Sequence, residues 1–166
     1  MTMPLPDPPG NPIPADARSL AGEHFGNIVK TVLDGNPDMP EPIAGRIVEE
    51  GIKFVVTCAQ NPGVGMAPSR VVDEGWHALL LHSALYADLC DRYGSFVHHY
   101  PGWDPTHYDP AILDRTRELI ARAGFDVDQQ LWSAPDDEVL VSVAAQCQHA
   151  PECTIRPMPT PQPPVS

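Results

Sequence analysis

The chain has 166 residues, and its 22 acidic and 10 basic side chains give a net charge of −12 with His neutral. This balance argues against nucleic acids and anionic membranes as partners, because both require a basic protein face. Hydrophobic residues make up 42% of the chain, too many for a fully disordered protein. We therefore expect a folded domain, with a small-molecule ligand or another protein as its partner.

Proline is concentrated at the two ends of the chain. Residues 1–14 and 151–166 hold 12 of the 21 prolines, so we expect disordered termini around a helical domain at 15–150. The N-terminus has no basic segment followed by an apolar one, and no run of 18 apolar residues occurs. These features predict a cytoplasmic protein, in which the four cysteines stay reduced.

Apolar residues recur at helical spacing through most of the central region, which predicts an all-α fold of about five helices in a single compact domain. Ser69 is the expected N-cap of the third helix, and Gly94 is its expected C-cap. Near the C-terminus, 139–143 also fits a strand, although no partner strand is evident. The expected helices are 16–34, 42–60, 70–93, 110–123 and 135–146, with one short turn in 126–132.

The third helix carries the most informative pattern. At about 100° per residue, Asp73 and His77 share a polar side, whereas His82 falls in an apolar arc about 220° wide with Tyr86 and Cys90. An arc of this width predicts a central helix that is buried on most sides. His77 and His82 lie about 140° apart, so they cannot bind one ion from a straight helix.

Asp73 and His77 are the candidate catalytic residues. A carboxylate and an imidazole four residues apart can hold one metal ion, or the Asp can orient the His for proton transfer. A surface ion pair or a helix-capping arrangement explains the same spacing without any chemistry.

His82, His98 and His99 are the candidate metal ligands. A histidine among apolar residues needs a hydrogen-bond partner or a metal, because burying it bare is costly. A segment of four or five residues that returns from the helix end reaches about 15 Å, which just covers the distance to His82. His77 lies about 25 Å up the helix, out of direct reach unless the chain crosses from a neighbouring helix. The alternative is that the histidine-rich loop, which also contains His107, only packs against the helix.

A third cluster consists of Cys147, His149 and Cys153. Two thiols and an imidazole can bind zinc or copper, but the cysteine spacing is looser than in the usual zinc pattern. A frayed helix end with incidental cysteines is the interpretation that we favour, and we assign these residues no role.

Thirteen unusual residue types recur in a fixed order within residues 42–101: Pro68, Ser69, Asp73, Trp76, His77, His82, Tyr86, Cys90, Gly94, Phe96, His98, His99 and Pro101. In these positions the segment resembles the glycine-rich domain-containing protein-like family, in its bacterial branch. The resemblance covers about 60 residues and implies a shared fold unit and interest in the Asp and His positions, but no reaction. Ser83 stands where Thr is common, Leu79 where plant members often have a second His, and the glycine-rich tail is absent.

Two functions follow from these observations. The first is a histidine-centred site that binds zinc, iron or copper and acts on a small molecule. The second is a non-catalytic protein-interaction module, in which the histidines are structural and the proline-rich ends recruit a partner. Metal-free acid–base chemistry by Asp73 and His77 is a third possibility.

Overall fold

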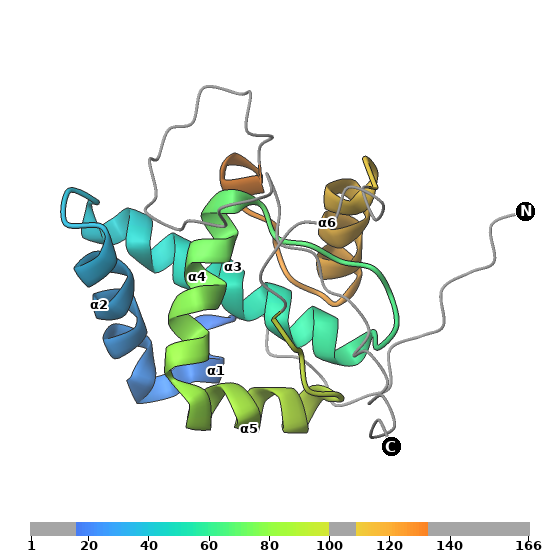
Figure 1. Cartoon of the computed structure of the whole chain (residues 1–166), viewed down its shortest axis with the longest axis horizontal. Coiled ribbons are helices and arrows are strands. Elements are labelled where there is room, and N and C mark those ends of the chain that lie inside the picture. Colours follow the sequence, from blue (N-terminus) through green and yellow to red (C-terminus); the bar gives the residue numbers. More distant parts are fainter. Residues whose placement is uncertain (1–15, 100–108, 133–166) are drawn as a thin grey trace, which may run out of the picture.

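The computed structural model describes residues 16–99 and 109–132, which contain helices and two short 3-10 turns but no strand (Figure 1). This confirms the all-α prediction. None of the helices in these two ranges combines the length and the apolar character that crossing a membrane requires. The predicted helix at 135–146, the predicted termini, His107 and the Cys147–His149–Cys153 cluster lie outside the described residues. The elements are α1 (Arg18–Ala21), η1 (Gly22–His24), α2 (Phe25–Gly35), α3 (Glu41–Gln60), α4 (Arg70–Leu81), α5 (Ser83–Tyr93), α6 (Ile112–Arg122) and η3 (Gln129–Trp132).

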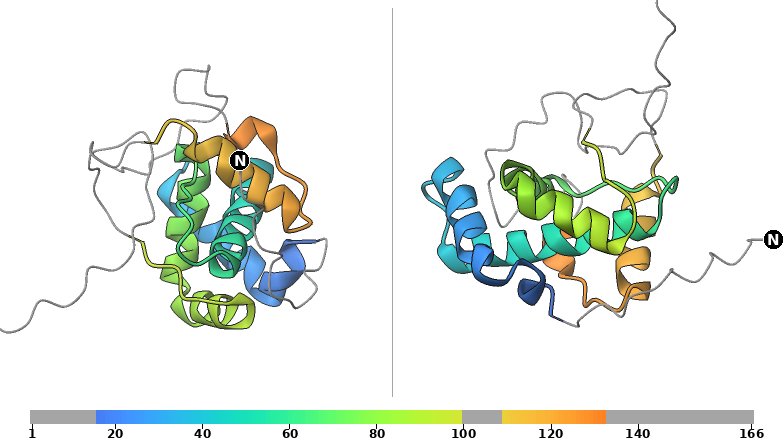
Figure 2. Two further views of the ribbon diagram at one scale, coloured as in Figure 1. Left: turned by 90° about the vertical axis from the view of Figure 1, so that its right-hand side faces the viewer. Right: turned by 90° about the horizontal axis from the view of Figure 1, so that it is seen from below.

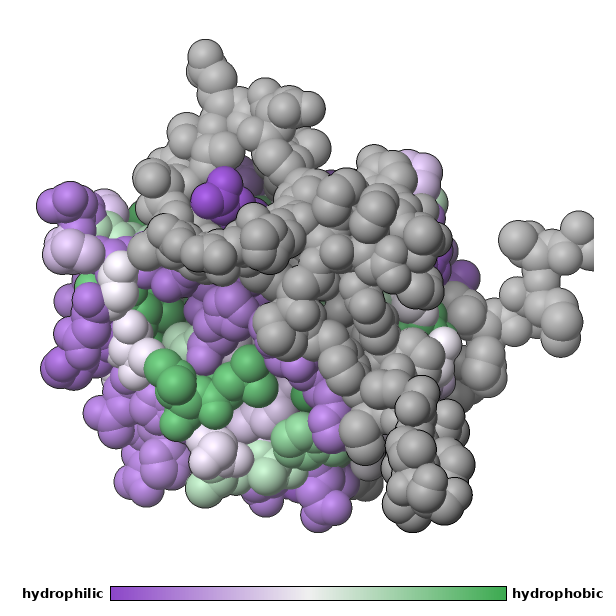
Figure 3. Space-filling model, in the orientation of Figure 1, coloured by the Kyte–Doolittle hydropathy of each residue, from purple (hydrophilic) through white to green (hydrophobic). Residues whose placement is uncertain are grey.

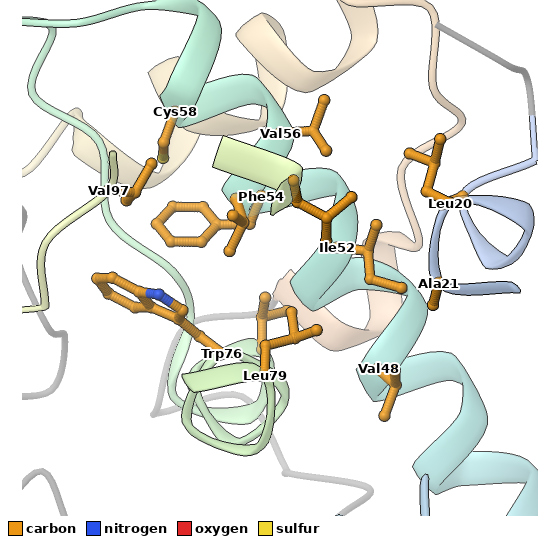
Figure 4. Close-up of a cluster of buried hydrophobic side chains, with 14 of the residues drawn as sticks. Leu20, Ala21, Val48, Ile52, Phe54, Val56, Cys58, Trp76, Leu79 and Val97 are labelled. Atoms are coloured by element: carbon orange, nitrogen blue, oxygen red, sulfur yellow. The ribbon is translucent and has the colours of Figure 1, made fainter. Parts of the chain in front are cut away.

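Helix α3 forms the centre of the fold. It begins beside Pro42 and ends at Gln60, as the sequence predicts, and all of its residues from 51 to 60 are buried. Figure 4 shows Phe54, Trp76 and Leu79 meeting between α3 and α4, and the rings of Phe54 and Trp76 lie edge to face at 5.1 Å. The segment 70–93, which we expected to be the central helix, instead packs across α3.

Glycines allow α3 and α4 to cross in direct backbone contact. A Cβ atom on Gly75 would lie 2.4 Å from the carbonyl oxygen of Ile47, and one on Gly51 would lie 2.9 Å from the carbonyl carbon of Gly75. No side chain fits at that crossing, so the glycines bring α4, which carries Asp73 and His77, against the core.

The single helix predicted for 16–34 is wrong, because the chain breaks into α1, η1 and α2. Gly22 has a φ of +53°, in the left-handed region that interrupts a right-handed helix. The break lets Leu20 and Ala21 enter the core before α2 begins at Phe25.

The single helix predicted for 70–93 is also wrong, because it bends at His82. The N–H of His82 donates to the carbonyl of Leu79 at 3.0 Å, three residues back instead of four, and a ψ of 61° takes His82 out of the helical region. After the bend, α5 runs across the end of α4 and beneath α3, as the view from below shows (Figure 1 and Figure 2). Gly94 then ends α5 as predicted, and the N–H of Ser95 donates to the carbonyl of Ala59 at 2.9 Å.

Two further predictions are confirmed. The helix expected at 110–123 is α6, which ends at Arg122, two residues before Gly124, and the short turn expected within 126–132 is η3. Lys53 fastens this last segment to α3, since its Nζ donates to the carbonyl of Asp126 at 2.6 Å and to Glu50 at 2.5 Å. The indole N–H of Trp132 donates to the other oxygen of Glu50 at 2.8 Å.

Candidate metal centre

Helix α4 places Asp73 and His77 one turn apart on the same face. The helix begins as predicted, since the Ser69 hydroxyl accepts the N–H of Val72 at 3.1 Å. The same hydroxyl donates to the carbonyl of Leu131 at 2.5 Å, which ties the start of the helix to η3. Asp73 therefore lies in the first turn of a helix whose N-terminus is fixed by two hydrogen bonds of the Ser69 hydroxyl.

The segment after α5 brings His99 back to α4. Tyr86 directs this segment, because its hydroxyl accepts the indole N–H of Trp76 at 3.1 Å and donates to the carbonyl of Val97. Two residues later, the ring of His99 lies edge to face with the Trp76 indole, with 4.6 Å between the ring centroids. The bend at His82 makes this return possible, since it turns α5 and the following residues back towards the core.

Asp73, His77 and His99 meet in one cluster. Nε2 of His77 lies 2.8 Å from Nε2 of His99 and 3.5 Å from Oδ2 of Asp73, and Nε2 of His99 lies 3.8 Å from Oδ1 of Asp73. Ligand atoms that are each about 2.1 Å from one ion lie about 3.0–3.4 Å apart in octahedral or tetrahedral geometry. The observed separations bracket this range, so these three side chains can hold a metal ion.

Burial controls the charges of the cluster. Asp73 is 1% exposed, and burial, with a smaller contribution from the neighbouring carboxylate of Glu74, raises its pKa from 3.8 to about 7. Burial lowers the pKa of His77, and burial together with repulsion from His77 lowers the pKa of His99 to about 4. Both rings are therefore neutral at pH 7, the form in which imidazole binds metals, and one ring N–H donates to the other ring.

The other two predicted metal ligands lie elsewhere. Nε2 of His82 is 2.9 Å from the hydroxyl of Thr31 on α2, which gives this half-buried histidine the hydrogen-bond partner that it needs. His98 is exposed, and its ring lies 4.8 Å from that of Phe96. Of the three predicted ligands, the structure brings only His99 to Asp73 and His77.

The expectation that His77 is out of reach of the returning loop is wrong. It assumed a straight helix through 70–93, whereas the bend at His82 shortens the path from Gly94 back to His77. No Gly or Pro stands beside His82, so the sequence carries no local sign of the bend. Instead, side-chain contacts hold it, namely the bond to Thr31 and the meeting of Tyr86 with Trp76.

No protein-family model, curated protein or solved structure matches the chain. The resemblance of residues 42–101 to the glycine-rich domain-containing protein-like family therefore stays a prediction, and the functional argument depends on the geometry of the cluster.

Proposed function

We propose that this protein binds a divalent transition metal, with zinc as the first candidate, through Asp73, His77 and His99, and that it uses the metal to act on a small molecule. The observation that supports this proposal most is the convergence of three ligand atoms within 4.8 Å of one another, from positions up to 26 residues apart in the chain. Two imidazoles and one carboxylate are a ligand set found in zinc enzymes and in iron(II) oxygenases.

The number of ligands favours chemistry over a purely structural metal. Structural zinc sites have four protein ligands, whereas catalytic sites have three and keep a position open for water or substrate. The described residues offer three ligands, and His77 is half-buried, so the site borders the surface of the part of the chain that the structure describes.

The interaction-module alternative has its own support in the two remaining histidines. His82 bonds to Thr31, and His98 lies beside the ring of Phe96, so both have packing roles that need no metal. Figure 3 shows hydrophobic residues gathered among hydrophilic ones on the visible coloured face. Phe96 and Leu81 are exposed large apolar side chains, at 51% and 76%. These residues are the place to test for a protein partner if the metal proposal fails.

Metal content separates the two functions. We expect full-length protein from a zinc- and iron-supplemented culture to contain about one equivalent of metal, measured by mass spectrometry after gel filtration. Asp73→Asn and His99→Ala should lose it, whereas His98→Ala should keep it, because the neighbouring ring is exposed and outside the cluster. Equal metal content in all four proteins, or none in the wild type, contradicts the proposal.

A further inference from the structure

The segment after α5 presents an aromatic ring that neither the core nor the proposed metal site uses. Gly94 ends α5, and the ring of Phe96 then lies edge to face with that of Tyr86, with 5.4 Å between the ring centroids. Phe96 is nonetheless 51% exposed, and the ring of His98, which is also exposed, lies 4.8 Å from it. Two neighbouring rings that face solvent form a surface for a partner, because burying aromatic area stabilises a complex.

A groove runs from Phe96 along α5. Helix α5 packs on α3 and α4, and Figure 1 shows it at one edge of the fold. The groove has a volume of about 470 Å³, which lies within the range of ligand-binding sites. It is open to solvent, so it suits an extended peptide better than a compact small molecule. Its lining residues are Ala87, Asp88, Cys90, Asp91, Gly94 and Phe96.

The charge of the groove favours a cation. Asp88 is paired with Arg92 at 2.9 Å, and Arg92 also lies over the ring of Tyr93. Asp91 is exposed, and no Lys or Arg in the part of the chain that the structure describes forms an ion pair with it. A carboxylate near an exposed aromatic ring is a combination that arginine binds well, because the guanidinium group pairs with the carboxylate and stacks on the ring.

The C-terminal sequence of this chain has the matching chemistry. Residues 155–164 read Ile-Arg-Pro-Met-Pro-Thr-Pro-Gln-Pro-Pro, with five prolines and with Arg156, the only Lys or Arg beyond Arg122. A segment of this composition favours the polyproline II conformation, which aromatic grooves bind at a small cost in conformational entropy. The proline-rich residues 1–14 contain Asp7 and no Lys or Arg, so they lack the cation that the groove favours.

The connecting chain is long enough for this contact. The described residues end at Trp132, and Arg156 follows 24 positions later, a separation that spans up to about 80 Å in an extended chain. A domain of this size has a radius of gyration of about 13 Å, so every part of its surface is within reach. Because the segment belongs to the same molecule, its effective concentration at the groove is on the order of 1 mM, and a weak contact is sufficient.

We propose that residues 155–164 bind in the groove along α5 of the same chain, with Arg156 paired with Asp91 and the prolines packed on the ring of Phe96. This inference does not depend on the proposed metal site. It gives the groove an occupant from within the chain, which a proline-rich segment of another protein must displace in order to bind there.

A nitroxide label on Cys153 tests the contact in the full-length protein. Cys147→Ser leaves Cys153 as the only cysteine besides Cys58 and Cys90, which are buried. We expect the label to broaden the amide nuclear magnetic resonance signals of Asp91 and Phe96. The signals of the turn between α2 and α3, which lies far from the end of α5 (Figure 1), should stay sharp. Absence of broadening at Asp91 and Phe96, or equal broadening of that turn, overturns the inference.

Charge reversal in the labelled protein tests the pairing itself. Asp91→Arg and Arg156→Asp should each remove the broadening, and the double variant should restore it, because the two charges are then opposite again. Glu118→Arg makes the same change of charge at an exposed position on α6 and should leave the broadening unchanged. Phe96→Ala should weaken it, since the prolines lose the ring on which they pack.

Three results overturn the inference. The first is broadening that survives Asp91→Arg or Phe96→Ala. The second is a double variant that does not restore the broadening. The third is broadening that passes from a labelled chain to an unlabelled chain mixed with it, because the contact then joins two molecules instead of two parts of one.

Discussion

Asp73 is expected to destabilise the metal-free protein, and bound zinc is expected to offset most of that cost, so the stability advantage of Asp73→Asn should shrink when zinc is added. The pKa of its carboxyl is 3.8 in the unfolded chain and about 7 in the fold. Between these values the folded state binds more protons than the unfolded state, so stability falls as pH rises from about 4 to 7. At 1.36 kcal/mol per pKa unit, the loss at pH 8 is about 4 kcal/mol.

The Asn side chain does not titrate, so Asp73→Asn should raise the melting temperature of metal-free protein at pH 8. The gain has an upper limit of about 4 kcal/mol, since the buried amide must itself find partners. The pKa of His99 is lowered to about 4, so the contribution of His99 to the free energy of unfolding is lost only as pH falls from 6.5 towards 4. At pH 8 His99 therefore does not affect the comparison between the variant and the wild type.

Thermal unfolding followed by circular dichroism, with EDTA or with zinc at pH 8, measures both states. With zinc at 100 times the dissociation constant, binding adds about 2.7 kcal/mol to the wild type, and the variant should lack this gain. In EDTA, the difference in melting temperature between Asp73→Asn and the wild type should shrink as pH is lowered towards 4. A variant that is less stable than the wild type in EDTA at pH 8, or that gains as much from zinc, refutes this reasoning.

Three structural predictions follow from the packing, each measured by chemical denaturation. Gly75→Ala should cost several kcal/mol, because its Cβ would meet a backbone carbonyl of α3 at 2.4 Å, whereas Gly26→Ala, with no atom within 4 Å, should be neutral or stabilising by about 0.5–1 kcal/mol. Tyr86→Phe should cost about 2 kcal/mol, since the buried indole and carbonyl that its hydroxyl joins lose their partner, and zinc affinity should fall as the segment carrying the third ligand loosens. Lys53→Met should cost about 3–5 kcal/mol, because it leaves the charge of Glu50 buried without its cation. Unchanged stability in any of the three destabilising variants contradicts the packing that it tests.

The sequence predicts those parts of the fold that depend on local pattern. The apolar stripe between Pro42 and Asn61 has helical spacing and clear ends, and Ser69 is a capping residue in front of a helical run, so α3 and the start of α4 were predictable. The pairing of Asp73 with His77 also follows from their spacing of four within one helix.

The sequence does not predict the partner that completes the site. Helical periodicity assumes a straight axis, and it continues through His82 without a Gly or Pro to mark an end. The bend depends on contacts between distant residues, such as Thr31 with His82, which no local pattern encodes. The arrival of His99 beside His77 depends on that bend, so the ligand set became visible only in three dimensions.

Isothermal titration of the EDTA-treated full-length protein with zinc tests the central claim most directly. The account predicts one zinc per chain for the wild type and for His98→Ala. It predicts a loss of zinc affinity of at least 100-fold for His99→Ala, because removing a ligand should lower the affinity at least as much as removing a group that hydrogen-bonds to a ligand. Wild-type protein without a zinc site, or His99→Ala that binds as tightly as His98→Ala, contradicts it.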